Sequence, residues 1–337
     1  MRSIQVTSVG RRVARHILRT FAAAAFGVAV CTDAASAAYP DHPIRLIVPT
    51  GAGGITDVLA RLVGQHLGNQ LGQPVVVENK AGASGVIGSQ FVAQASPDGY
   101  TLLFAFPTHV ANPSTIKSLP YDTATAFAPI GRVGQVTEIL LVNQDSDMHS
   151  VEDLLKKAGA GAARNRLNYG SVGAGSQGDL CTLVFESQAR IKMESVPYKS
   201  EPEMLTALMR NDVQVAFTSV PAALPQIRAG KVRALAVSSA QRLALLPDVP
   251  TVAEAGLKGY DVTGWNGLFA PKGTPKPVID ALNHALNQAL KDAKVKEQFQ
   301  SLGVPVLGGT PEQLQQAVVR DIAMIKETLG AVGYAPQ

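Results

Sequence analysis

The segment VPTGAGGITD, Val48 to Asp57, joins a strand-like run, IRLIVP (44–49), to a helix-like run, ITDVLARLVGQHL (55–67). Three glycines lie in the turn between the two runs. The first amides of a helix have no partner within the helix, and its dipole favours negative charge, so such a junction can bind an anion. The segment predicts an α/β fold with a candidate anion site. The alternative is a simple tight turn capped by Thr56 or Asp57.

The spacing of the glycines excludes the two common nucleotide motifs. A Walker loop needs a lysine after its last glycine, but Gly54 is followed by Ile55. The dinucleotide fingerprint needs a third glycine at the position of Thr56. We therefore expect no nucleotide at this loop. No cofactor is expected elsewhere either.

Strand-like and helix-like segments alternate along most of the chain, and short apolar runs between helices indicate parallel sheets covered on both faces. The expected strands are 44–49, 74–80, 101–106, 166–172, 193–198, 213–219 and 232–239. The expected helices lie near 55–70, 84–95, 176–190, 201–210 and 221–229, and over 275–292 and 311–330.

Two longer extended segments, 128–145 and 260–271, exceed what one sheet needs. One outward and one returning crossing predict two α/β lobes joined by paired hinge strands. We expect the first lobe to comprise 39–135 plus 265–337, and the second to comprise 136–264.

Residues 1–38 have the order of an export signal: a basic region, the apolar run FAAAAFGVAV (21–30) and the small residues AASAA (34–38). Cleavage is expected after Ala37 or Ala38. Ordinary secretion is favoured over the twin-arginine route that Arg11-Arg12 suggests. Lipidation at Cys31 is disfavoured because the preceding Val30 is bulky.

Cleavage would remove five of the 30 Lys and Arg residues and one of the 26 Asp and Glu residues, which leaves 25 of each. The positive charge thus belongs to the signal and does not indicate a nucleic-acid surface. Cys181 would be the sole remaining cysteine, so an intrachain disulfide is impossible. Beyond residue 40 no uncharged apolar stretch is long enough to predict a membrane span.

Catalytic and metal-binding patterns are sparse. The hydrolase elbow G-x-S-x-G is nearly met around Ser176, but Ala174 replaces its first glycine. The six histidines show no zinc-binding spacing, so no metal is expected. An exported hydrolase with Ser176 as nucleophile is kept as an alternative to a binding protein.

Polar loops rich in Gly, Ser and Thr follow several expected strands. Ligand crevices in open α/β sheets lie at the carboxyl ends of strands, so these loops are expected to hold a carboxylate through amides and hydroxyls. The loops are PTGAGGIT (49–56), FPTH (106–109), SVGAGSQG (171–178), VPYKS (196–200) and FTSVPA (217–222).

The chain resembles the extracytoplasmic solute receptors of the tripartite tricarboxylate transporter system, the Bug family, over essentially all of residues 39–337. The matching segments are YPDHPIRLIVP (39–49), the run from Gly53 to Ala105, THVANP (108–113), LPYD (119–122), FAPIGRV (127–133), LNYGSVGAGS (167–176), VPYKS (196–200), residues 220–256 and GLFAPKGTPKPVI (267–279). The resemblance implies a two-lobed type II periplasmic binding fold whose cleft closes on a small organic anion. It also implies a monomeric periplasmic receptor, without catalysis, that serves membrane transporter subunits. A receptor that presents its ligand to a sensor kinase is the alternative.

Carried over by position, the resemblance implies a set of ligand-binding residues in both lobes. In the first lobe these are Thr50, Gly51, Ala52, Gly53, Gly54, Ile55, Thr108 and His109, with Asp57 bracing the turn and His109 either binding or structural. In the second lobe they are Ser171, Gly175, Ser176, Tyr198 and Lys199, where Lys199 either pairs with a second carboxylate or stays solvated.

The chain departs from the family pattern at positions that bear on specificity. Thr50 and Ala52 stand where many members have prolines. Thr218, followed by Ser219, stands just after Phe217, where many members have an acidic or amide residue, so no counter-anion for an ammonium group is expected at this position. A plain aliphatic or aromatic carboxylic acid is therefore favoured over an amino acid. Phe106 and Trp265 are candidates to flank an apolar or aromatic ligand body, with hinge packing as the alternative for Trp265.

Overall fold

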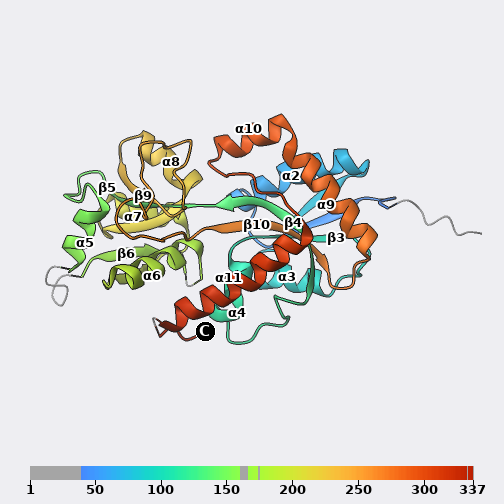
Figure 1. The fold of residues 1–337 in the computed structure, drawn as a ribbon, viewed down its shortest axis with the longest axis horizontal. Helices are drawn as coiled ribbons and strands as arrows, with labels where there is room; N and C mark the ends of the chain where they lie inside the picture. The colour runs from blue at the N-terminus through green and yellow to red at the C-terminus, as the bar shows by residue number, and fades with distance from the viewer. Residues whose placement is uncertain (1–38, 160–165, 174, 332, 337) are drawn as a thin grey trace, which may run out of the picture. The chain divides into compact units, whose positions relative to one another are not determined.

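The computed structural model describes residues 39–159, 166–173, 175–331 and 333–336. The chain divides into two compact units, 1–41 and 42–337, and the fold below is that of the second unit. The expected export signal lies outside the described residues. The second unit contains two five-stranded sheets covered by helices (Figure 1).

The first sheet has the order β2-β1-β3-β10-β4. Its strands are β1 (Ile44–Val48), β2 (Val75–Asn79), β3 (Thr101–Ala105), β4 (Phe127–Val136) and β10 (Gly264–Pro271). β1 pairs in parallel with β2 and β3, whereas β10 is antiparallel to both β3 and β4.

The second sheet has the order β7-β6-β8-β5-β9. Its strands are β5 (Glu138–Asn143), β6 (Asn168–Ser171), β7 (Glu194–Pro197), β8 (Val215–Ser219) and β9 (Val232–Val237). β6 is parallel to β7 and β8, and β5 is antiparallel to β8 and β9.

The expectation of purely parallel sheets is therefore wrong, because β5 and β10 run against their neighbours. Both strands enter their sheet directly from the other sheet rather than through a covering helix. A strand that arrives without a crossover connection is free to pair antiparallel. Buried apolar runs alone do not reveal this direction, since both kinds of central strand are covered on both faces.

Two crossings connect the sheets, as the two long extended segments predict. β4 passes through Thr137 into β5, and β10 returns to the first sheet. The crossings pair with each other where they leave the first sheet, with Gly264 opposite Val136. This arrangement places two adjacent strands at the junction, although the exact lobe boundaries at 135/136 and 264/265 stay a prediction.

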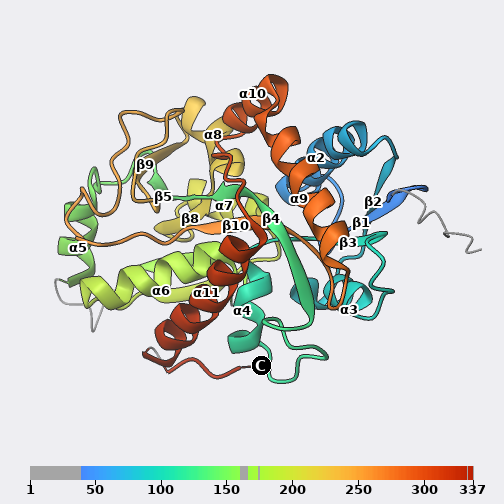
Figure 2. The ribbon, with the colours of Figure 1, turned by 45° about the vertical axis from the view of Figure 1, so that its right-hand side comes forward.

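Helices cover both faces of each sheet (Figures 1 and 2). α2 and α9 pack together on one face of the first sheet, and α3, α4 and α11 lie on the other. α5 and α6 cover one face of the second sheet, and α7 and α8 cover the other. The helices are α2 (Ile55–Leu71), η1 (Ala83–Gly85), α3 (Val86–Ala93), α4 (Thr108–Thr115), α5 (Val151–Gly159), α6 (Gln177–Ala189), α7 (Glu201–Met209), α8 (Val220–Arg228), α9 (Lys276–Lys291), α10 (Ala293–Ser301) and α11 (Pro311–Ala331).

Three of these helices, α4, α5 and α10, are absent from the sequence-based assignment. α4 matters most, because the segment FPTH (106–109) was expected to be a loop, whereas Thr108 is the first residue of this helix. Pro113 within the helix and the short length obscure its pattern. The polar residues after β3 therefore sit at a helix N-terminus.

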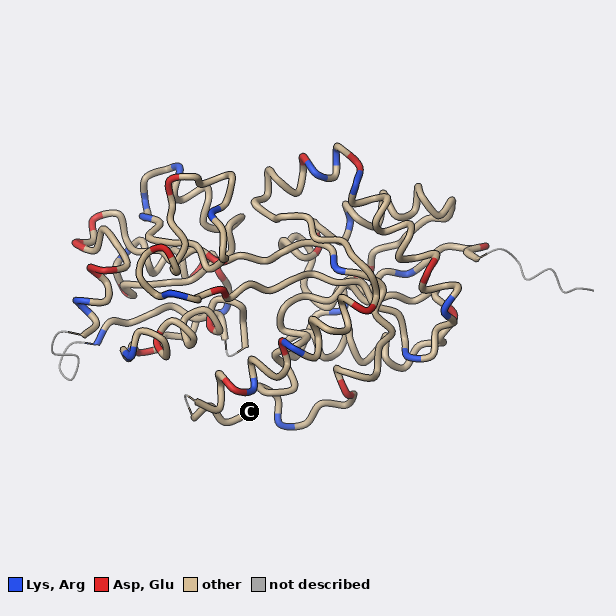
Figure 3. The backbone as a smooth tube through the Cα atoms, in the orientation of Figure 1, with Lys and Arg blue, Asp and Glu red and all other residues tan. Residues whose placement is uncertain are grey.

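Among the described residues, no helix combines the length and apolar character that crossing a bilayer requires. Acidic and basic residues are interspersed along the coloured part of the backbone (Figure 3).

Candidate functional site

A cavity of about 290 Å³ lies between the two sheets, at the carboxyl ends of β1, β3, β6 and β8. This is the position at which open α/β sheets bind ligands. The wall comprises Thr50, Gly54, Ile55, Thr56, Phe106, Pro107, Thr108, Val136, Glu138, Gly170, Ser171, Val172, Ser176, Gln177, Gly178, Asp179, Glu201, Phe217, Ser219 and Asn266.

The glycine turn presents the N-terminus of α2 to this cavity. Gly54 caps the helix in an extended conformation, without a side-chain hydrogen bond to the first amides. Because Gly54, Ile55 and Thr56 all line the cavity, the first amides of α2 are available to an anion there. The turn thus supplies hydrogen-bond donors and no cation.

Asp57 braces this turn from inside. Its Oδ2 accepts hydrogen bonds from the amide of Gly53 at 2.9 Å and from Nε of Arg61 at 3.0 Å, and its Oδ1 accepts one from Asn79 at 2.9 Å. Asn79 also donates to the carbonyl of Thr50 at 3.1 Å. Burial alone would raise the pKa of Asp57, but the hydrogen bonds from Arg61, Gly53 and Asn79 lower it below its usual value. The loop is therefore tied to β2 through one carboxylate.

Replacing Asp57 with asparagine is expected to lower the free energy of unfolding by about 1.5–3 kcal/mol, because the hydrogen bonds lose their charged acceptor. Urea unfolding at pH 7 measures this loss. Asp122→Asn is the matched control, since Asp122 accepts one amide hydrogen bond in an exposed turn that asparagine also stabilises. Equal stability of the two variants would show that Asp57 does not hold the turn.

The N-terminus of α6 faces the cavity from the second sheet. The hydroxyl of Ser176 caps this helix by accepting from the amide of Asp179 at 3.3 Å. A methyl group on Gly178 would lie 2.5 Å from the carbonyl oxygen of Phe217, so only glycine allows α6 to approach β8 this closely. Gln177 and Gly178, which follow the cap, both line the cavity. Among the described residues no histidine lines the cavity, so Ser176 has no imidazole base there.

Eight of the residues expected to bind ligand lie in the cavity wall: Thr50, Gly54, Ile55, Phe106, Thr108, Ser171, Ser176 and Ser219. The structure places the others outside it: Gly51, Ala52, Gly53, His109, Gly175, Tyr198, Lys199, Thr218 and Trp265. Ligand contact by either group stays a prediction.

His109 lies in the core of the first lobe rather than in the cavity wall. Its side chain is 2% exposed and packs against the rings of Phe127 and Phe269, with centroids 5.0 and 5.4 Å away. Burial lowers the pKa of His109 to about 4. The structure therefore favours the structural alternative for this residue.

Thr218 is fully buried in β8, between two residues that line the cavity, Phe217 and Ser219. Thr218 itself is not among the residues that line the cavity. The expectation that a ligand's ammonium group finds no counter-anion depends on this residue. The acidic residues of the wall, described below, come from other elements.

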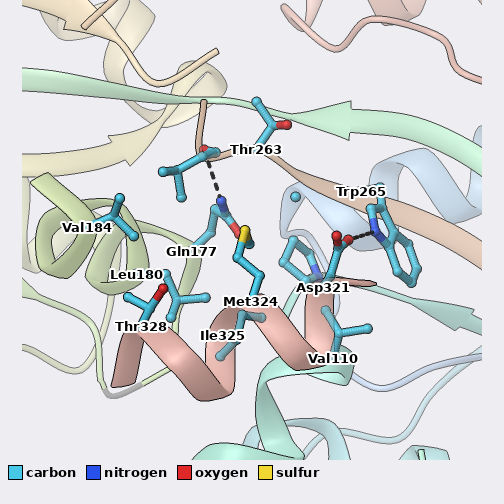
Figure 4. Close-up of a pocket in the computed structure, with 13 residues that line it drawn as sticks. Val110, Gln177, Leu180, Val184, Thr263, Trp265, Asp321, Met324, Ile325 and Thr328 are labelled. Carbon is cyan, nitrogen blue, oxygen red and sulfur yellow. Dashed lines mark hydrogen bonds between the residues drawn. The ribbon is translucent and has the colours of Figure 1, made fainter. Parts of the chain in front are cut away.

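Trp265 lines a separate small pocket behind β10, together with Gln177 of α6 and several residues of α11. Its indole N–H donates to Oδ2 of Asp321 at 2.7 Å, and Gln177 donates to the carbonyl of Val262 (Figure 4). Trp265 thus joins the returning crossing to α11. The contact is compatible with hinge packing, the alternative given for Trp265, and ligand contact by this residue stays a prediction.

Sequence reasoning missed several wall residues, among them Glu138, Asp179, Glu201 and Asn266. Glu138 opens β5 directly after the crossing, and Glu201 opens α7 directly after the segment VPYKS. Both glutamates are the first residue of an element, next to a crossing or to a loop expected to bind ligand. This position is the signal in the sequence that could have found them. Neither glutamate belongs to a recognisable motif.

Two mixed sheets joined by two crossings, with a cavity between them, are the architecture of a two-lobed binding fold. The family described as "Tripartite tricarboxylate transporter family receptor" (TctC) matches residues 59–333, and the chain belongs to this family. The resemblance found in the sequence is thereby confirmed. Members of the family are periplasmic binding proteins.

Individual relatives support the family assignment. Protein BugT of Bordetella pertussis is 36% identical over 298 residues, which cover 86% of this chain and 90% of BugT. The structure of R. palustris Rpa4515 with adipate has a TM-score of 0.80 at 34% identity, and covers 89% of this chain and 100% of that chain. MatC from Rhodopseudomonas palustris with bound malate has a TM-score of 0.75 at 31% identity, with 86% and 100% covered.

Proposed function

We propose that this receptor captures a small organic carboxylate in the cavity between its two sheets and delivers it to the membrane subunits of a tripartite tricarboxylate-type transporter. The proposal includes export to the periplasm with cleavage of residues 1–38, and action as a monomer. Adipate and malate in the relatives of known structure support a carboxylate as the ligand class.

The observation that carries this proposal is the pair of helix N-termini, α2 and α6, that face one cavity from the two sheets. Each contributes amides and a favourable dipole, and the hydroxyls of Thr50, Ser171 and Ser176 lie in the same wall. Charge-assisted hydrogen bonds contribute about 1.5–3 kcal/mol each, and micromolar binding needs about 8 kcal/mol, so a few such donors suffice.

The capture mechanism we propose is closure about the two paired crossings. A ligand that touches both helix N-termini gains all its contacts only when the sheets approach each other, so it favours the closed population. Small-angle scattering measures this change as a decrease in the radius of gyration at ligand saturation. An unchanged radius with a saturating ligand would contradict closure.

A thermal-shift screen over mono-, di-, tri- and aromatic carboxylates tests the ligand class, because a ligand that binds only the folded protein raises its melting temperature. At least one carboxylate is expected to raise it. No response to any carboxylate would overturn the proposal.

Ser176→Ala is expected to weaken binding of the ligand so identified by about tenfold, since one hydrogen-bonding group and the α6 cap are lost. Ser150→Ala is the matched control, because Ser150 caps α5 through the amide of Asp153 but lies outside the cavity wall. Isothermal titration should therefore show weaker binding for Ser176→Ala alone. An equal loss of affinity in both variants would show that the substitution acts through loss of a helix cap in general rather than through a lost ligand contact.

A further inference from the structure

The wall of the cavity contains three carboxyl groups, those of Glu138, Asp179 and Glu201. Among the residues that line it there is no Lys, Arg or His. A site for a dianion would be expected to offer positive charge to the second carboxylate. Capture of a carboxylate alone therefore does not explain why the wall contains three carboxyl groups and no cationic side chain.

Asp179 has hydrogen-bond partners within the protein. Its Oδ1 accepts hydrogen bonds from the hydroxyls of Ser171 at 3.0 Å and Tyr169 at 3.3 Å. Its amide in turn donates to Ser176. This residue thus supports the N-terminus of α6.

Glu138 is different, because its main chain is fixed while its side chain lacks a partner. Its amide donates to Oγ of Ser238 at 2.9 Å, and its carbonyl accepts from the amide of Ser238 at 2.9 Å. The residue is 3% exposed, yet its Oε2 has no hydrogen-bond partner among the described residues. A buried, unpaired polar atom in a cavity wall costs free energy unless a ligand pairs with it.

Glu201 lies in the same part of the wall and is bound to the strand partner of Glu138. Ser219, which stands opposite Glu138 in the pairing of β5 and β8, donates to Glu201 through its amide at 3.2 Å and its hydroxyl at 2.8 Å. Both oxygens of Glu201 thus act as acceptors. Its place in the first turn of α7 also favours a negative charge.

The two glutamates oppose each other electrostatically. Burial, and then the negative charge of Glu201, raise the pKa of Glu138 well above its usual value. The other titratable groups near Glu138 are Cys181 of α6 and Tyr260, whose pKa values burial also raises. None of these neighbours supplies a positive charge.

We propose that Glu138 and Glu201 bind a positively charged, N–H-bearing group of the ligand, so that this receptor selects an amino carboxylate over a dicarboxylate. The inference rests on the proposed function, since the helix N-termini of α2 and α6 would hold the ligand's carboxylate. An ammonium group supplies donors to the unpartnered Oε2 and balances the charge of Glu201. A second carboxylate at that place would meet like charge instead.

This inference revises the preference for a plain carboxylic acid drawn from the sequence. That preference depended on Thr218, which is not among the residues that line the cavity. The counter-anions come instead from the start of β5 and the start of α7, two positions 63 residues apart in the sequence.

Matched ligands test the selection. Isothermal titration compares 4-aminobutanoate, 5-aminopentanoate and the proteinogenic α-amino acids with succinate, glutarate and 1,4-diaminobutane. At least one amino carboxylate is expected to bind about tenfold or more tightly than the dicarboxylates. If succinate or glutarate binds as tightly as every amino carboxylate, the inference is wrong and the proposed function stands. If the diamine alone binds, the proposed function fails as well.

Glu138→Gln and Glu201→Gln identify the residues responsible. Each is expected to weaken amino-carboxylate binding at least about tenfold while binding of any dicarboxylate holds or improves. Glu152→Gln, the same change on the exposed face of α5, is the matched control and should leave binding unchanged. Thermal melts in the absence of ligand separate this effect from misfolding. Unchanged amino-carboxylate affinity in both cavity variants would overturn the inference.

The pH dependence of binding distinguishes the two charge states of Glu138. An ammonium group favours the ionised carboxylate, so binding should release a proton and tighten as the pH rises from 5 to 8. Titrations in buffers of different ionisation enthalpy measure that proton, and Glu138→Gln should abolish its release. If binding weakens as the pH rises, Glu138 donates a proton to a ligand carboxylate, and selection of an amino group is excluded.

Discussion

Replacing Trp265 with alanine is expected to lower the free energy of unfolding by about 3–5 kcal/mol, the usual loss for a buried tryptophan. The indole is 4% exposed and packs against Phe269, and its N–H donates to Asp321 of α11, which is itself 6% exposed. The substitution leaves a cavity behind β10 and an unpaired acceptor (Figure 4). Urea unfolding at pH 7 measures the loss.

Two further variants separate the contributions. Trp265→Phe keeps most of the packing but removes the hydrogen bond, so a loss of about 1–3 kcal/mol is expected. Val319→Ala changes an exposed position of α11 and should change the free energy of unfolding by less than about 0.5 kcal/mol. Equal losses for alanine and phenylalanine would show that the hydrogen bond, not the packing, anchors α11.

The same variants test whether Trp265 touches the ligand. Because the residue lies outside the cavity wall, Trp265→Phe is expected to bind the ligand with unchanged affinity. A loss of binding larger than about tenfold would return Trp265 to the ligand site.

The second large effect is expected from His109, which should make the protein lose stability as the pH falls. Its pKa is about 4 in the folded protein because of burial, against 6.5 in an exposed histidine. Between those values the unfolded chain binds a proton that the folded chain does not, so stability falls as the pH decreases from about 6.5 to 4. At about 1.4 kcal/mol per pKa unit, this loss amounts to about 3 kcal/mol.

Comparison with His109→Phe isolates this contribution. Phenylalanine fits among the rings of Phe127 and Phe269 and carries no proton-binding site, while the carboxylates that also titrate in this range are common to both proteins. The stability difference between variant and wild type should therefore grow in favour of the variant as the pH falls. His284→Asn, at an exposed position of α9, serves as control. Parallel pH profiles for wild type and His109→Phe would contradict the argument.

Much of the fold could be predicted because its signals are local. The glycine turn at 51–54, the amphipathic pattern of α2 and the apolar runs of β1 and β8 depend on residues adjacent in sequence. The short helix α4 escaped prediction because Pro113 breaks its pattern. The directions of β5 and β10 escaped because direction depends on which sheet a strand comes from.

The candidate site was only partly predictable, for a related reason. Gly54, Ile55 and Ser176 follow strands directly, and a rule about strand ends locates them. His109 lies only one residue beyond Thr108 in α4, yet one lines the cavity and the other is buried among aromatic rings. The face on which a helix residue falls is set by packing against other elements.

The sequence by itself determined the alternation of strands and helices, the absence of nucleotide motifs, the two extended crossings and the family. These follow from composition and from patterns within short windows. Only the tertiary structure decided that Glu138 and Glu201 line one cavity while Thr218 does not. Side chains from β5 and α7 become neighbours only when the second sheet pairs β5 with β8, and that pairing joins segments distant in the chain.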